Sequence, residues 1–79
     1  MYTVKITTKC EGCTITEIAG LRGMKTIVSV EGPDGLQTNR RPHKIEGWKT
    51  EEGALQFISS EFINAVKKGR ISTFEVEAV

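Results

Sequence analysis

The chain has 79 residues, of which 38% are hydrophobic and 27% are charged, and its formal net charge is +1 at pH 7. This length predicts one small domain spanning residues 1–79, and the composition is typical of a folded chain rather than a disordered tail. The balanced charge excludes a general attraction to nucleic acid or to an anionic membrane, so such binding would need a local patch. No apolar run approaches the roughly 18–20 residues that span a bilayer. We therefore expect a cytoplasmic protein without membrane association.

The first half of the chain predicts a series of short strands. Residues 2–8 alternate between apolar and polar side chains, which is the period of a half-buried strand. Residues 14–18 are rich in β-branched side chains, which favour a strand that pairs back on the first as a hairpin. Residues 24–31 are the clearest strand, and the Gly-Pro-Asp-Gly turn at 32–35 returns the chain antiparallel through 36–41. We expect a loop after this strand, anchored by Ile45 and Trp48.

Residues 51–68 predict the one long helix. Thr50 is a suitable N-cap, two glutamates occupy the first turn, two lysines occupy the last, and Gly69 follows as a stop. Residues 71–79 alternate again and predict the last strand. Phe57 falls on the polar side of the helical wheel. The stripe predicted to face the sheet consists of Leu55, Ile58, Phe62, Ala65 and Val66, with Ala54 at its edge.

This order of elements predicts an α+β fold with two layers. The strands would form a mainly antiparallel β-sheet, and the long amphipathic helix over residues 51–68 would pack on one face of it, burying its apolar stripe. The first or the last strand could form an uncovered sheet edge, and such an edge invites pairing with another chain. Homodimerisation is therefore open on the sequence alone.

Cys10 and Cys13 have the spacing in this chain that most suggests chemistry. A structural zinc site usually takes four thiol or imidazole ligands, and beyond these two cysteines the chain offers only His43. Three interpretations stay open: reduced thiols in a turn, a metal site completed by His43 or by a second chain, and a disulfide or redox couple. We expect no cofactor, with zinc as the alternative.

Residues 4–30 resemble the heavy-metal-associated domains of copper chaperones, in which a strand runs into a Cys-x-x-Cys loop, then a helix, then a second strand. The segment Gly-Met-Lys-Thr-Ile-Val-Ser-Val at 23–30 is similar to that second strand. The resemblance implies a helix over 14–22, an element order of βαββαβ, and Cu(I) bound by Cys10 and Cys13, because soft thiolates select that ion. The chain departs from the family in having Thr-Thr-Lys where the family has Gly-Met-Thr before the first cysteine.

A basic segment follows the predicted hairpin, with Arg40, Arg41, His43 and Lys44 close together. Such side chains can contact phosphates or an acidic protein surface, where arginine is favoured over lysine. No nucleic-acid motif or stacking run accompanies them, so we expect a protein partner rather than nucleic acid. Trp48 and Phe57 are candidate aromatic anchors for that partner, unless the loop folds over Phe57 with Trp48 alongside.

No motif predicts catalysis. His43 has no nucleophile partner, the glycines form no phosphate-binding loop, and a domain of this size has little room for a water-excluding pocket. We expect a non-enzymatic protein-binding domain of the adaptor or inhibitor type that phages and mobile elements carry. The alternatives are a metal-binding domain that uses Cys10 and Cys13, and a nucleic-acid accessory protein that uses the basic segment. The predicted partner-binding residues are Arg40, Arg41, Lys44, Trp48 and Phe57.

Overall fold

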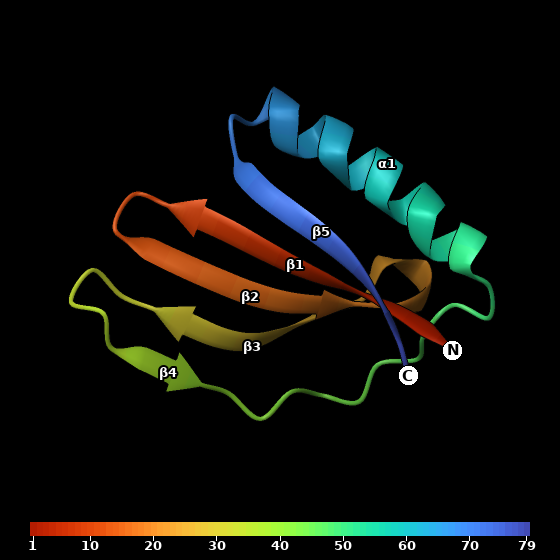
Figure 1. Cartoon of the computed structure of the whole chain (residues 1–79), viewed down its shortest axis with the longest axis horizontal. Helices are drawn as coiled ribbons and strands as arrows, with labels where there is room; N and C mark the ends of the chain where they lie inside the picture. The colour runs from red at the N-terminus through yellow and green to blue at the C-terminus, as the bar shows by residue number, and fades with distance from the viewer.

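The computed structural model describes residues 1–79 and has two layers, a five-stranded antiparallel sheet and one helix packed against it (Figure 1). The predicted α+β fold class is confirmed. The strand order in the sheet is β4-β3-β2-β1-β5, so β5 and β4 form its edges. The one α-helix does not combine the length and the apolar character that a membrane span requires. The elements are β1 (Tyr2–Cys10), β2 (Cys13–Ala19), β3 (Lys25–Glu31), β4 (Gln37–Asn39), α1 (Glu51–Lys67) and β5 (Ile71–Ala78).

The central strand β1 carries the core. Val4 and Ile6 are buried between the sheet and α1, where they meet Ala19 of β2 and Ala54 of α1. Val4 is the only large side chain that is completely buried. A ring of half-buried side chains surrounds this small cluster: Tyr2, Trp48, Phe57, Ile58, Phe74 and Val76. The core is therefore thin, and its edges depend on aromatic side chains.

The segment after the cysteine pair is a strand. β2 pairs with β1 in continuous register from Cys10–Cys13 to Val4–Ala19, across a two-residue turn in which Gly12 has φ +79°. The β-branched residues of this segment favour the extended backbone. The helix over 14–22 and the βαββαβ order implied by the resemblance to heavy-metal-associated domains are therefore wrong.

Helix α1 begins and ends close to the predicted positions, but it presents a different face to the sheet. The Thr50 side chain accepts a hydrogen bond from the Gly53 N–H at 3.2 Å, and Gly69 follows the last turn with φ +68°. Small side chains bring the helix close to the sheet, because Ala54 and Ala65 are its buried residues. Phe57 and Ile58 pack beside them. The predicted inward stripe is wrong in three of its members, which are exposed: Leu55, Phe62 and Val66.

The connection between β4 and α1 is an extended segment tied to the sheet at four points. The Arg40 N–H donates to the Val28 carbonyl at 2.7 Å, and the His43 N–H donates to Thr26 Oγ1 at 3.1 Å. Further along, the Glu46 carbonyl accepts from the Leu21 N–H at 2.7 Å. Trp48 and Tyr2 then exchange two backbone hydrogen bonds of 2.8 Å. The segment thus follows the outer edge of β3 and crosses to the start of β1 (Figure 1).

Candidate binding surface

The basic residues that the sequence singled out lie on this tied segment. We call residues 40–44 the basic strap. The side chains of Arg40, Arg41 and Lys44 are exposed, as is that of His43. Two of the four attachment points, at Arg40 and at His43, lie within the strap itself, so its side chains project from a fixed edge rather than from a free loop.

A shallow hollow beside the strap is lined by cations and by no carboxylate. Its lining consists of Lys25, Thr26, Ile27, Arg40, Arg41 and His43. Lys25 was not among the residues that the sequence singled out, because it is brought to the strap by the pairing of β3 rather than by its position in the chain. Lys25 is paired with Glu61 at 3.2 Å, so the positive charge concentrated here is that of Arg40 and Arg41, although the whole chain carries a net charge of only +1.

Trp48 and Phe57 stack on each other instead of projecting toward a partner. Their ring centroids lie 5.0 Å apart, with the rings tilted by 38°, and both side chains pack against the core cluster. A side chain on Gly53 would approach Trp48 Cδ1 to 2.9 Å, so the indole lies on the first turn of α1. The structure therefore places Arg40 and Arg41 at one hollow, whereas Lys44 lines a different one beside Ile45 and Glu46. The two aromatic side chains pack on each other and on the core.

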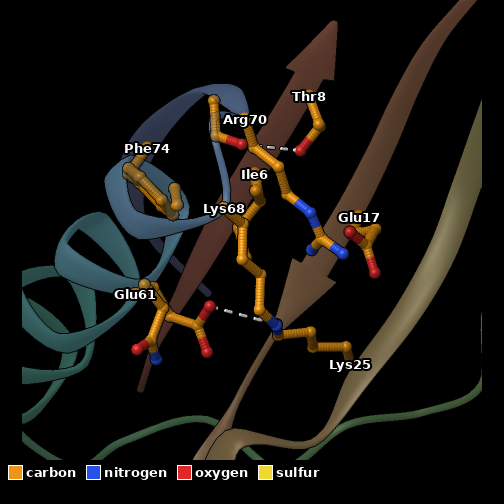
Figure 2. Close-up of a pocket in the computed structure, with 11 residues that line it drawn as sticks. Ile6, Thr8, Glu17, Lys25, Glu61, Lys68, Arg70 and Phe74 are labelled. Carbon is orange, nitrogen blue, oxygen red and sulfur yellow. Dashed lines mark hydrogen bonds and ion pairs between the residues drawn. The ribbon is translucent and has the colours of Figure 1, made fainter. Parts of the chain in front are cut away.

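A second hollow, of about 140 Å³, lies between the C-terminal half of α1 and strands β1 and β2 (Figure 2). Lys25 Nζ lies 3.2 Å from Glu61 Oε2 across it and 6.0 Å from the Phe57 ring centroid. Figure 2 shows Arg70 extending toward Glu17. Cationic and acidic side chains nearly balance in this hollow, so it offers no selective attraction to a charged ligand. Its charges instead connect the helix to the sheet.

Cys10 and Cys13 lie directly opposite each other at the end of the β1–β2 hairpin, and both are free thiols. His43 is held at Thr26, which pairs with Ile18. Ile18 is five residues along β2 from Cys13, or about 17 Å at the rise of a strand. The structure therefore does not bring the three predicted metal ligands together. The chain contains no cluster of three or more His, Cys, Asp or Glu side chains that could hold a metal ion.

The two thiols affect each other's chemistry. A side-chain hydrogen bond with Cys10 raises the pKa of the Cys13 thiol, and desolvation and the charge of Cys10 raise it further. Because the thiolate is the nucleophile, Cys13 should alkylate slowly at pH 8, and its rate should rise with pH until the raised pKa is passed. Cys10→Ala should lower that pKa and speed the alkylation of Cys13 several-fold at pH 8. Iodoacetamide labelling with peptide mapping measures this rate, and identical pH–rate curves for the two proteins would contradict the prediction.

No protein-family model matches this chain, and neither a curated protein nor a solved structure matches it. The strap, the hairpin thiols and the charged hollow are therefore the observations from which a function can be proposed.

Proposed function

We propose that this chain is a non-enzymatic protein-binding domain that uses the basic strap to occupy an acidic surface on a macromolecular partner. The observation that carries this proposal is the hollow beside the strap, which no carboxylate lines and in which Arg40 and Arg41 have no ion-pair partner. Arginine guanidinium groups present forked donors that match carboxylates, and Arg is enriched at protein interfaces. The two adjacent arginines of the strap are suited to that contact.

The anchoring of the strap supports a binding role. Association costs free energy when a flexible segment must become ordered, and a segment that is already held in its bound shape avoids that cost. Backbone hydrogen bonds from Arg40 and His43 to β3 provide such anchoring. The strap is therefore preorganised for surface contact, as expected of an adaptor or an inhibitor.

Several features favour a protein over nucleic acid as the partner. Single-stranded nucleic acid is bound by combining cations with aromatic rings on which bases stack. The strap contains no Phe, Tyr or Trp, and the nearby Trp48 and Phe57 rings are packed on each other and on the core. The strap also offers few charges for tracking a phosphate backbone.

A charge-reversal experiment tests the strap. Arg40→Glu/Arg41→Glu should lower the capture of the partner at least tenfold, because two attractive contacts become repulsive. Immobilised chain and quantitative mass spectrometry of bound proteins measure this capture, and calorimetry with the purified partner confirms it. The matched control is Lys9→Glu/Arg22→Glu, which changes the net charge equally at two exposed positions outside the strap.

The proposal fails if the two double variants capture the partner equally well. Titration of duplex DNA at several salt concentrations tests the alternative function, in which the strap binds nucleic acid. Four phosphate contacts would give a slope of about −3.6 for the logarithm of the binding constant against the logarithm of the salt concentration. If the chain shows this slope and the strap variant loses it, the chain is a nucleic-acid accessory protein.

A further inference from the structure

The chain exposes more surface than its mass predicts for a monomer. Its accessible area is 5780 Å², whereas the scaling of area with mass predicts about 4,700 Å² for a folded monomer of 8.7 kDa. The excess is about 1,000 Å², which is comparable to the roughly 800 Å² that each partner buries in a standard interface. One partner of ordinary size would therefore bring the exposed area to a typical value.

The exposed apolar side chains of α1 indicate where that area lies. Leu55, Phe62 and Val66 are 48%, 56% and 63% exposed and recur at helical spacing on one flank of the helix, which we call the flank stripe. The opposite flank faces β2 and β3, because Glu61 on it contacts Lys25. Helix α1 packs on β5 and β1 and lies at the β5 side of the sheet (Figure 1). Because Glu61 marks the flank that faces β2 and β3, the flank stripe on the other side of the helix runs along the β5 edge.

Strand β5 is an uncovered edge along the same side. It has eight residues, no proline and a continuous register with β1. The Val79 N–H donates to the Met1 carbonyl, so in an antiparallel pair the odd-numbered residues of β5 point their backbone groups at β1. The even-numbered residues Ser72, Phe74 and Val76 therefore direct their N–H and C=O groups outward. Such an edge is a template for another strand.

We propose that a second copy of this chain covers this side, with the two β5 strands pairing antiparallel about a two-fold axis and the two flank stripes packing together above them. A two-fold axis perpendicular to the sheet leaves both helices on the same face. The sheet becomes continuous across the axis, and one contact covers both the open edge and the exposed apolar flank.

Charge and aromatic pairing together select the register of this contact. A two-fold axis at Glu75 would place Glu75 opposite itself, and an axis at Val76 would place Glu75 opposite Glu77. An axis at Phe74 pairs residues 71–77, opposes Thr73 with Glu75, and brings the two Phe74 rings together beneath the flank stripes. Because like charges directly opposite are destabilising and aromatic pairs are favourable, the geometry points to the Phe74 register.

The helices are complementary in charge for the same arrangement. A two-fold axis makes α1 and its copy antiparallel, so that the first turn of one approaches the last turn of the other. Glu51 and Glu52 occupy the first turn, whereas Lys67 ends the helix and Lys68 caps it. The acidic end of each helix thus lies toward the basic end of its partner. The two basic straps, at the opposite sheet edge, would face away from the axis as two separate binding surfaces.

Measurement of mass in solution tests the dimer. Sedimentation equilibrium on the untagged chain at 10–200 µM should give twice 8.7 kDa. Phe62→Lys/Val66→Lys places two charges in the flank stripe, and it should weaken association at least 100-fold while leaving the circular dichroism spectrum unchanged. Ile63→Lys is the matched control, because Ile63 is 55% exposed on the same helix but points away from the sheet. That variant should remain a dimer.

Disulfide trapping tests the register even if the stripe variant fails to fold. In a Cys10→Ser/Cys13→Ser background, Thr73→Cys/Glu75→Cys should form covalent dimers on oxidation. The opposed residues form a non-hydrogen-bonded pair with Cα atoms about 4.5 Å apart, which suits a disulfide. Neither Thr73→Cys nor Glu75→Cys alone should cross-link, because in this register position 73 of one copy lies opposite position 75 of the other, and never opposite itself.

Each other outcome overturns the proposal. A monomeric mass at 200 µM excludes the second copy. The same conclusion holds if the monomeric chain binds a different protein through this side. A dimer that survives Phe62→Lys/Val66→Lys places the contact elsewhere, and cross-linking by Glu75→Cys alone excludes the Phe74 register. Arg40→Glu/Arg41→Glu should remain dimeric, so failure of the strap proposal and failure of the dimer are distinguishable.

Discussion

Gly20→Ala should destabilise the fold by about 2–4 kcal/mol and release the segment that carries the basic strap. A Cβ atom at Gly20 would overlap with Ile45 Cγ2 and with the Glu46 carbonyl oxygen. The isoleucine side chain can rotate, but the carbonyl oxygen is backbone and accepts the 2.7 Å hydrogen bond from the Leu21 N–H. The added methyl group therefore breaks that bond or displaces the segment.

Urea unfolding followed by circular dichroism measures the loss, and amide exchange at Leu21 and Trp48 reports the release of the segment. Gly32→Ala is the matched control, because its Cβ would meet only the Asp34 side-chain oxygen, at 3.2 Å. Its effect should stay within about 0.5 kcal/mol. Equal stability of the two variants would show that residues 45–46 adapt and do not fix the strap.

Local sequence signals predicted most of the fold. The alternation of apolar residues gave β1 and β5, the β-branched run gave β2, and the turn residues at 32–35 gave the β3–β4 hairpin. The helix was bounded by Thr50 and Gly69, whose capping roles depend only on neighbouring residues. These elements were predictable because each is specified by residues within one or two turns of chain.

The face of α1 and the composition of the candidate site depend on contacts between distant segments. The wheel favoured the stripe with Leu55 and Phe62, but Phe57 faces inward because Trp48, from the preceding loop, packs on it at 5.0 Å. Lys25 joins the basic hollow only through the sheet. The Cys10–Cys13 pair was visible in the sequence, whereas the separation of His43 from it follows from the tie to Thr26. No local pattern encodes these placements.

Trp48→Ala should also destabilise the fold, by about 2–4 kcal/mol, through lost packing alone. The indole covers Gly53 and stacks on Phe57, and only four side chains form the buried core cluster. The backbone exchange between Trp48 and Tyr2 is retained by alanine, so the segment keeps its path. The free energy of unfolding of a native domain is about 5–15 kcal/mol in total, so the loss of this one ring would remove a large share of it.

A double-mutant cycle with Phe57→Leu isolates the contact between the two rings. Their coupling should be about 0.5–1.5 kcal/mol, as for other aromatic pairs. Leu36→Ala is the control, because Leu36 is 71% exposed, and it should change stability by less than about 0.5 kcal/mol. The cycle uses circular dichroism rather than tryptophan fluorescence, since Trp48 is the only tryptophan and the cycle removes it.

Trp48→Phe should keep most of the stability and all of the partner capture, because the ring holds the domain together while the strap makes the contact. Loss of capture with unchanged stability in Trp48→Phe would move Trp48 from the core into the binding surface.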